Sequence, residues 1–454
     1  MLERKITAYL EKWLTRNTVL LVDGVRQAGK SYAIREFGKV HFGQNFFEFN
    51  FHEHRDLISD FNRCKTAQEL ITNLSLYSPR PFVPGKTLIF LDEIQLVDGI
   101  DWPMFSKYLL ADGRFRFVLS GSLLGVTMNG LSQPASGLSD SLDSLDSSRP
   151  GAALDEVRLY PMDFEEYLWA NGIAKETIEE IKDCFRKGSV VPPLWQKRLL
   201  DLFYEYLFVG GFPDAVNSYL KGRDLQELRL AQKRIEAMHR RDVASHVEAA
   251  ERIHLMDVYE AMSGQINSKN KRFKIGSILK QGERYDIADD FRWLVQAGLA
   301  YPVYNASEPS LPLRLNEKRN LVKLYESDVG MLSYHLFETG TIQKLLVKEK
   351  AINYGAIFEN AAAELLSAHG FSSLYYYDSK KHGEVDFLIE KEGEVVPLEI
   401  KSGKDYKIHH ALTYFMGDDA PYGLKRAYVF SDANSSKENK IQYFPTYFLD
   451  CLSR

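Results

Sequence analysis

The sequence predicts a mixed α/β protein built from more than one domain. Its first 160 residues alternate strand-like and helix-like stretches, which is the pattern of a parallel sheet with crossover helices. Helical patterns follow to about residue 263, and an α/β pattern returns from about residue 345 onward. Because 454 residues exceed one typical domain, we expect about two to four domains.

The first informative element is an apolar run over residues 19–22, which predicts a buried strand. It leads into the pattern G-x-x-x-x-G-K-S over residues 24–31, and residues 31–37 predict a helix. A strand, a glycine-rich turn and a helix start are the context in which this pattern binds phosphates. The turn's N–H groups and the positive end of the helix then face the phosphates. A chance glycine-rich turn before a surface helix is the alternative, and the flanking elements disfavour it.

In this loop we expect Lys30 to neutralise the β- and γ-phosphates of ATP, and the Ser31 hydroxyl to take one position on Mg²⁺. The predicted nucleotide contacts are Gly24, Val25, Arg26, Gln27, Ala28, Gly29, Lys30, Ser31, Tyr32, Asp92 and Ser122.

A second apolar run, residues 87–91, ends in Asp92 and Glu93. It predicts a buried parallel strand whose carboxyl end opens on the ligand crevice. We expect Asp92 to hold Mg²⁺ through a water and Glu93 to act as general base on the attacking water. Alone, the run would be better interpreted as a strand that ends in a charged turn. Residues 115–122 predict the next strand, with Ser120 or Ser122 near the γ-phosphate.

The composition, 45% hydrophobic and 26% charged, allows ordinary cores. A net charge of −5 gives no global attraction to nucleic acid, so such binding would need a local patch. The chain has only three cysteines, Cys64, Cys184 and Cys451, and they lack metal-ligand spacing. This fits a protein of a reducing compartment and argues against structural zinc and against a disulfide framework. No apolar run reaches 18 residues, so we expect a cytoplasmic protein without a membrane segment.

The middle of the chain changes character. Residues 129–152 are rich in Ser, Asp, Gly and Pro and predict a loop. A helix is expected from residue 163, with Asp163 as its cap. Two glycines followed by Phe and Pro at 210–213 predict a tight turn between helices.

Residues 264–335 predict another small unit, with helices over 273–279 and 286–295 and a β-hairpin wing from 301–304 and 313–315. A basic run favours contact with duplex DNA, and four acidic residues oppose it. The basic residues are Lys269, Lys271, Arg272, Lys274 and Arg284, and the acidic ones are Glu283, Asp286, Asp289 and Asp290. Packing against protein is the alternative role.

Two paired strands are predicted over 384–389 and 395–401 around a Glu-Gly turn. Asp386 lies on the first, and Glu399 and Lys401 share one face of the second. A carboxylate from each of two strands suits a hard divalent cation, and the lysine can orient a water or steady a developing charge. Glu359, on a helix over 355–363, adds a third carboxylate. The alternative is a surface hairpin with cross-strand ion pairs.

Taken together, the chain resembles a bacterial and archaeal group of AAA-type ATPases, relatives of the STAND NTPases and of the archaeal ATPases. The resemblance is carried by residues 24–31, Leu91-Asp92-Glu93, Ser120-Gly121-Ser122, residues 159–167, Gly210-Gly211-Phe212-Pro213, Arg241-Asp242-Val243, Glu384-Val385-Asp386-Phe387 and Glu399-Ile400-Lys401. Asp23 departs from the group, which usually has a small residue there, and its charge is expected to weaken ATP affinity.

The resemblance implies a P-loop NTPase core, then a helical and winged-helix region, then a C-terminal restriction-endonuclease-like α/β domain similar to PD-(D/E)XK nucleases. The expected boundaries are 1–160 for the ATPase domain, 161–263 for the helical lid, 264–335 for the winged helix and 345–454 for the nuclease-like domain.

The expected function is Mg²⁺-dependent ATP binding and hydrolysis, coupled to DNA, a protein partner or a second copy of the chain. The expected catalytic residues are Lys30, Glu93, Asp386, Glu399 and Lys401, and the expected metal ligands are Ser31, Asp92, Glu359, Asp386 and Glu399. One alternative is a nucleotide-gated binding module with little hydrolysis and an inactive nuclease fold. Another is a DNA-cleaving protein. Arg114, Arg116, Arg240 and Arg241 are candidates for an arginine that acts on a neighbouring copy's nucleotide.

Overall fold

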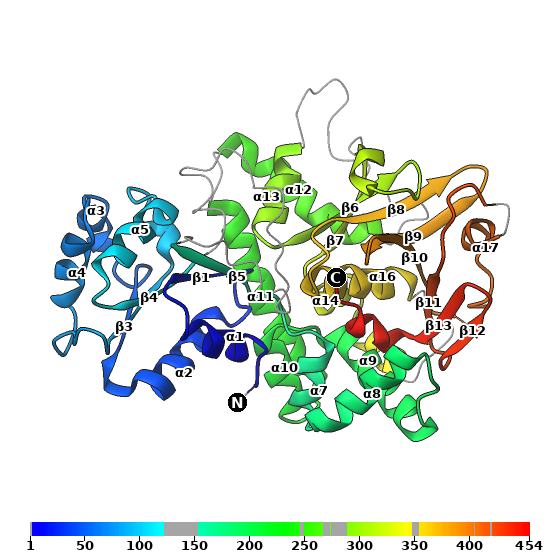
Figure 1. Ribbon diagram of the computed structural model, residues 1–454, viewed down its shortest axis with the longest axis horizontal. Helices are drawn as coiled ribbons and strands as arrows, with labels where there is room; N and C mark the ends of the chain where they lie inside the picture. Colours follow the sequence, from blue (N-terminus) through cyan, green and yellow to red (C-terminus); the bar gives the residue numbers. More distant parts are fainter. Residues whose placement is uncertain are drawn as a thin grey trace. The chain divides into compact units, whose positions relative to one another are not determined.

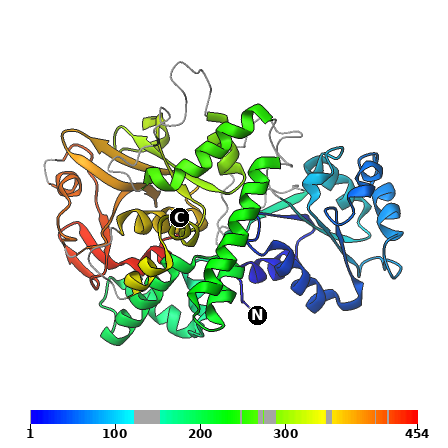
Figure 2. The ribbon, with the colours of Figure 1, turned by 180° about the vertical axis from the view of Figure 1, so that it is seen from behind.

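The computed structural model describes residues 2–121, 153–245, 249–266, 273, 288–346, 354–403, 405–417 and 420–454. The chain divides into two compact units, Glu3–Tyr160 and Pro161–Arg454. Figure 1 shows the first unit mainly in blue to cyan and the second in green to red, and Figure 2 shows the chain from behind.

The first unit is built on a five-stranded sheet in which every strand is parallel to its neighbours. Its strands are β1 Val19–Asp23, β2 Phe46–Asn50, β3 Leu88–Asp92, β4 Arg116–Ser120 and β5 Leu154–Arg158. The order is β2-β3-β4-β1-β5, so β4 separates the two strands that carry the nucleotide motifs. Every residue of β1 and β3 is buried, as expected of strands covered on both faces.

Helices cover both faces of this sheet. They are α1 Ile6–Trp13, α2 Lys30–Phe42, α3 Ile58–Phe61, α4 Ala67–Ser75 and α5 Trp102–Asp112, with short 3-10 turns η1 Gly43–Asn45, η2 Arg55–Leu57 and η3 Ile94–Leu96. One face packs its alternate strand residues, such as Leu21, Ile89 and Leu119, into a core with α3, α4 and α5. Helix α2 contacts β2, β3 and β4.

The second unit begins with helices. They are α7 Phe164–Ala170, α8 Lys175–Lys187, α9 Pro193–Val209, α10 Pro213–Leu220, α11 Leu225–Ser245 and α12 Ala249–Ile266, followed by α13 Ala288–Gln296, α14 Val329–Leu336, α15 Thr339–Leu346, α16 Gly355–Ala368 and α17 His410–Met416. The predicted cap of α7 is confirmed, because the Asp163 side chain accepts a hydrogen bond from the Glu166 N–H. No helix in the described part of the chain is long and apolar enough to cross a membrane.

An eight-stranded mixed sheet completes this unit. Its strands are β6 Ala300–Ala306, β7 Glu317–Glu326, β8 Leu374–Ser379, β9 Gly383–Lys391, β10 Glu394–Ile400, β11 Ala427–Ser431, β12 Ser436–Glu438 and β13 Ile441–Pro445. The order is β12-β13-β11-β10-β9-β8-β6-β7, and a last 3-10 segment, η6 Thr446–Cys451, follows it. The predicted fold class is confirmed: a mixed α/β protein with a parallel sheet of P-loop NTPase type, a helical region and a C-terminal mixed sheet.

The strand expected at 301–304 in a separate wing lies in β6 of this larger sheet. β6 and β7 pair with each other, and β6 also pairs in parallel with β8. The residues 313–315, expected as a strand, lie instead in the 3-10 turn η5 Leu313–Asn316, where the Leu315 N–H donates to the Pro312 carbonyl at 3.0 Å. Alternation of apolar residues alone does not distinguish such a turn from a strand.

Part of the expected winged helix lies outside the described residues. This holds for most of the first helix at 273–279, for Glu283 and Asp286, and for the basic residues Lys269, Lys271, Arg272, Lys274 and Arg284. Of the other two acidic residues, Asp289 forms an ion pair with Arg292, and Asp290 is buried. The whole of the loop expected at 129–152 also lies outside the described part.

Candidate nucleotide site and C-terminal acidic site

The backbone of the loop after β1 requires both motif glycines. Gly24 has a φ of 143°, and a Cβ there would lie 2.1 Å from the carbonyl oxygen of Leu159. Gly29 has a φ of 97° and caps the start of α2. Both values lie in the region that residues with a Cβ rarely adopt, so the glycines set the path of the loop.

Lys30 lies over this loop. Its Nζ donates to the carbonyl oxygens of Gly24 at 2.7 Å and Val25 at 3.1 Å. Burial lowers the pKa of Lys30, while the negative charges of Asp23, Glu93 and Asp92 act in the opposite direction. The ammonium is therefore held among carboxylates at the carboxyl ends of β1 and β3.

The carboxylate of Asp92 joins four segments of the unit. The hydroxyls of Ser31 and Ser120 both hydrogen-bond to it, and Nδ2 of Asn50 donates to its Oδ2 at 2.9 Å. Burial raises the pKa of Asp92 above its usual value, and the hydrogen bonds from Ser120 and Ser31 oppose part of that rise. Two predicted magnesium ligands, Ser31 and Asp92, are thus in direct contact.

Glu93 directly follows β3 and has a φ of 59°, which is uncommon for a residue with a side chain. Nε2 of Gln95 donates a hydrogen bond to its carboxylate. A Cβ at Gly121, just after β4, would lie 2.7 Å from Oε1 of the same glutamine. Ser122, which we also expected near the γ-phosphate, lies outside the described residues.

The motif analysis missed Arg4, a buried residue that holds the loop. Its Nη1 donates to the Ala28 carbonyl at 2.6 Å, and its Nη2 donates to the Tyr160 carbonyl at 2.7 Å. No periodic signal could have identified it, because the bonded carbonyls lie 24 and 156 residues away.

Asp23, the departure noted in the sequence, is buried. It lies opposite Arg158 in the parallel pairing of β1 and β5, and Nε of that arginine is 3.9 Å from its Oδ2. The positive charge of Arg158 offsets part of the negative charge that we expected to weaken ATP affinity.

Three of the four candidate arginines already contact groups of their own chain. Arg114 donates to Asp112, and Arg116 donates to the carbonyls of Leu14 and Arg16. Arg240 pairs with Glu236 and Glu260, whereas Arg241 is exposed on α11.

The four residues expected in the C-terminal acidic site lie on β9, β10, the residue after β10, and α16. Nζ of Lys401 donates to Oε1 of Glu399 at 2.7 Å. Oδ2 of Asp386 accepts from the Ile400 N–H at 2.8 Å, and Glu359 accepts from the Tyr325 hydroxyl at 3.1 Å. All three carboxylates are buried.

The charges of this site act on one another. Burial raises the pKa of Glu399, and Lys401 opposes that rise while Glu359 adds to it. Burial acts to lower the pKa of Lys401, but Glu399, Asp386 and Glu359 raise it above its usual value. The side chains are therefore close enough to share one electrostatic environment.

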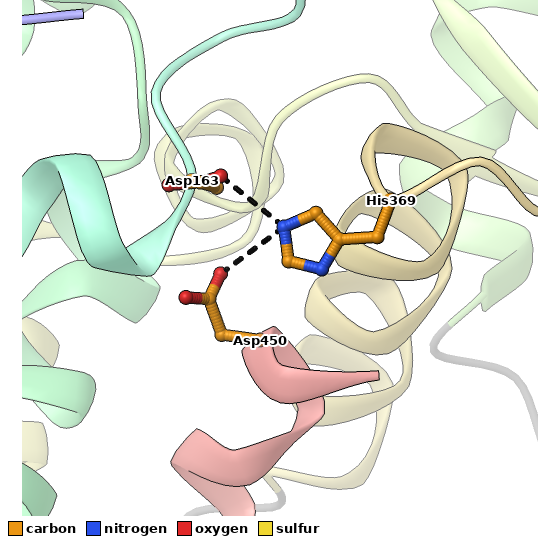
Figure 3. A group of neighbouring side chains, drawn as sticks. All are labelled: Asp163, His369 and Asp450. Atoms are coloured by element: carbon orange, nitrogen blue, oxygen red, sulfur yellow. Dashed lines mark hydrogen bonds and ion pairs between the residues drawn. The ribbon is translucent and has the colours of Figure 1, made fainter. Parts of the chain in front are cut away.

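A different trio brings three ligand atoms together. Among the described residues, the only His, Cys, Asp or Glu trio with ligand atoms within 4.8 Å of one another is Asp163, His369 and Asp450 (Figure 3). The carboxylates of Glu359, Asp386 and Glu399 do not meet that distance as a trio. Sequence analysis assigned Asp163 only as a helix cap and did not identify the other two.

Comparison with protein families matches each part of the chain separately. Residues 16–168 match a family described as AAA domain. Residues 200–341 match Domain of unknown function (DUF8612), and residues 354–449 match Domain of unknown function (DUF4143). Because neither of the latter descriptions names a winged helix or a nuclease, those two assignments stay predictions. A search of curated proteins gave no match.

Three solved structures resemble the chain at low identity. The Walker-type ATPase PABY2304 of Pyrococcus abyssi is 15% identical, with a TM-score of 0.41 over 74% of this chain and 96% of that one. AMPPCP-bound DnaA from Aquifex aeolicus is 14% identical, with a TM-score of 0.27 over 58% and 73%. C. elegans PCH-2 is 12% identical, with a TM-score of 0.26 over 52% and 66%.

The fold of the N-terminal unit is indicated by the family match and by the sheet itself. The match to an AAA domain covers the parallel sheet and the loop after β1. The N-terminal unit therefore has a parallel sheet of P-loop NTPase type, in a region that is similar to AAA domains.

Proposed function

We propose that the protein binds ATP with Mg²⁺ and hydrolyses it. The observation that carries this proposal is the direct contact of Ser31 and Ser120 with Asp92, beside Lys30 on the loop. A hydroxyl and a carboxylate are oxygen ligands of the kind that Mg²⁺ prefers, so these residues fit the cation. The match of residues 16–168 to an AAA domain supports the same conclusion.

In this proposal each residue has one task. The loop N–H groups and Lys30 hold the phosphates, and Ser31 and Asp92 hold the cation, which neutralises charge on the phosphates. Glu93 accepts the proton of the attacking water. Its left-handed backbone turns the chain at the end of β3, and Gln95 orients its carboxylate by a hydrogen bond.

The test is ATP turnover by the purified chain, with Mg²⁺ or with EDTA, and with or without duplex DNA. Turnover that requires Mg²⁺ supports the ATPase. Binding without turnover in any condition favours the second candidate, a nucleotide-gated switch. Stimulation by DNA supports coupling to nucleic acid, whereas a basal rate unchanged by DNA favours a protein partner or a second copy of the chain.

For the C-terminal unit we propose a metal-dependent nuclease site at Asp386, Glu399, Lys401 and Glu359. Buried carboxylates beside a lysine favour it, because Lys401 can support a nucleophile or a leaving charge. In the present arrangement Ile400 and Lys401 hold the carboxylates of Asp386 and Glu399. A cation there would have to replace the contact between Lys401 and Glu399. An inactive fold that only binds DNA is the alternative.

We propose a division into ATPase, helical, winged-helix and nuclease-like parts, in which β6 and β7 of the third part join the sheet of the fourth. The end of the first compact unit at Tyr160 supports the first boundary, because the second unit begins at Pro161. DNA contact by the third and fourth parts belongs to the same proposal.

A further inference from the structure

A side-chain cluster outside both sites joins three distant parts of Pro161–Arg454. Asp163 precedes α7, His369 follows α16, and Asp450 lies in η6 (Figure 3). Nε2 of His369 is 3.2 Å from Oδ2 of Asp163 and 3.5 Å from Oδ1 of Asp450. Two carboxylates therefore converge on a single ring nitrogen.

The contact of the other ring nitrogen, Nδ1, determines the tautomer of His369. Nδ1 lies 3.2 Å from the carbonyl oxygen of Leu452. Because a carbonyl oxygen only accepts, Nδ1 carries a proton, and in the neutral ring Nε2 presents a lone pair to the two carboxylates. Histidines that ligate metals typically donate their second N–H to such a carbonyl.

A second histidine of the unit shows the contrasting arrangement. His335 has its Nδ1 at 3.0 Å from Glu326 and its Nε2 at 3.0 Å from Glu236, so each nitrogen faces its own carboxylate. That geometry suits an imidazolium, which has one N–H on each nitrogen. At His369 a single N–H would have to serve two carboxylates, and it could point directly at only one of them.

The distances at His369 fit a cation between the three groups. A charge-assisted N–H···O bond is about 2.7–2.9 Å long, which is shorter than both distances found here. Ligands held at about 2.0–2.2 Å around a tetrahedral ion lie about 3.3–3.6 Å apart. The observed 3.2 and 3.5 Å are close to those edges.

Backbone N–H groups hold both carboxylates in place. Oδ1 of Asp163 accepts from the Glu166 N–H at 2.9 Å, which leaves its Oδ2 toward the histidine. Asp450 accepts from the N–H groups of Phe164 and Glu165 at 3.2 and 3.0 Å. Carboxylates that ligate metals are commonly hydrogen-bonded in this way.

The surrounding interior is rich in carboxyl groups. Burial raises the pKa of Tyr206 well above its usual value, and the carboxyl groups of Glu364, Asp328, Asp163 and Asp450 raise it further. Several buried carboxyl groups near one point are costly unless a positive charge or protons compensate them. A divalent cation supplies such compensation.

We propose that Asp163, His369 and Asp450 bind one divalent transition-metal cation of the Zn²⁺ class. One imidazole nitrogen and two carboxylate oxygens are suitable ligands for such an ion, and a water can complete four-coordination. No cysteine is needed. The ion would connect the start of α7 with the end of α16 and with the C-terminal segment, and would thereby stabilise the unit.

The full chain is treated with EDTA, the EDTA is removed, and zinc is titrated into the protein in a calorimeter. Thermal unfolding is then measured with and without zinc. Excess Mg²⁺ is present to occupy oxygen-ligand sites such as the one expected at Asp92. We expect one zinc per chain and a higher Tm than in EDTA. His369→Gln should lose this zinc, and the matched control His335→Gln should keep it. A folded wild type that binds no zinc overturns the proposal, as does His369→Gln with unchanged stoichiometry.

X-ray absorption on the zinc-loaded wild type keeps the test valid if the His369 variant does not fold. A shell of nitrogen and oxygen donors at about 2.0–2.2 Å with scattering from one imidazole supports the assignment. Sulfur donors at about 2.3 Å or several imidazoles place the ion elsewhere and contradict it.

Discussion

Nη1 of Arg4 donates a 2.6 Å hydrogen bond to the carbonyl of Ala28, and so a residue 24 positions away supports the glycine-rich loop after β1. The same guanidinium holds the Tyr160 carbonyl through Nη2. The loop is thus fixed by its own glycines and also by a buried cation outside the motif. The first prediction depends on this contact.

Arg4→Ala should lower the free energy of unfolding of the first unit by about 2–4 kcal/mol, because two charge-assisted hydrogen bonds are lost in a buried place. It should also weaken binding of a fluorescent ATP analogue, since Ala28 loses its support. Denaturant unfolding and an equilibrium titration measure the two effects. Arg55→Ala, at an exposed arginine of the same unit, is the control and should change neither.

Lys30→Ala should abolish binding of the analogue, because the charge that neutralises the phosphates is removed. Glu93→Gln should keep binding and reduce turnover by on the order of 10²-fold or more, since the amide cannot accept a proton. Glu53→Gln, at an exposed carboxylate of the same unit, should keep both activities. Turnover unchanged in Glu93→Gln would contradict the assigned base.

The ion pairs of His335 predict a pH-dependent stability. Burial acts to lower the pKa of His335, but Glu326 and Glu236 raise it to about 10. Burial acts to raise the pKa of Glu236, but His335, Tyr259 and Arg240 lower it to about 2. The histidine's contribution is complete below its ordinary pKa of 6.5 and is lost as the pH rises toward 10. The contribution of Glu236 is complete above pH 4.5, its ordinary pKa, and is lost as the pH falls toward 2.

The stabilisation by this group should therefore be greatest between pH 4.5 and 6.5. Denaturant unfolding of wild type and His335→Gln measures it. The variant should be less stable by about 3 kcal/mol in this window, because two buried carboxylates lose their cation. The difference should shrink as the pH rises toward 10, and a difference that stays constant up to that pH would exclude a charged His335.

Gly211→Ala should destabilise the second unit by more than about 3 kcal/mol, because a Cβ there would lie 2.1 Å from the Met162 carbonyl oxygen. The N–H of Gly211 also donates to Oδ2 of Asp328 at 2.6 Å, so the turn cannot move away freely. Gly222→Ala is the matched control, because a Cβ at Gly222 meets nothing within 4 Å. Equal Tm values for the two variants would show that the turn relaxes without cost.

Asp386→Asn tests the proposed nuclease site. Asparagine keeps an oxygen that can accept from the Ile400 N–H, so the fold should survive while the charge needed for the cation is lost. Wild type should nick DNA with Mg²⁺ or Mn²⁺, and the variant should not. Asp405→Asn, at an exposed position after β10, should behave as wild type. Equal cleavage by wild type and Asp386→Asn with every metal and nucleotide would make Asp386 structural.

The sequence by itself determined the fold class and the position of the glycine-rich loop between β1 and α2. The contacts that define the loop are local: Gly24, Gly29, Lys30 and Ser31 lie within eight positions, from the residue after β1 to the first two residues of α2. The carboxylate at the end of β3 was also predictable, because the carboxyl ends of parallel strands meet at one edge. Local spacing and backbone conformation carry enough information for such sites.

Only the tertiary structure decided the contacts between distant positions. It brought Arg4 to the Ala28 carbonyl, placed β6 and β7 in the C-terminal sheet, and brought Asp163, His369 and Asp450 together. Strand pairing and side-chain convergence depend on how whole elements pack, and they leave no period or spacing in the chain. Asp163 takes part in both kinds of contact. Its hydrogen bond as a helix cap is local in the sequence, whereas its contact with His369 is formed only by the tertiary structure.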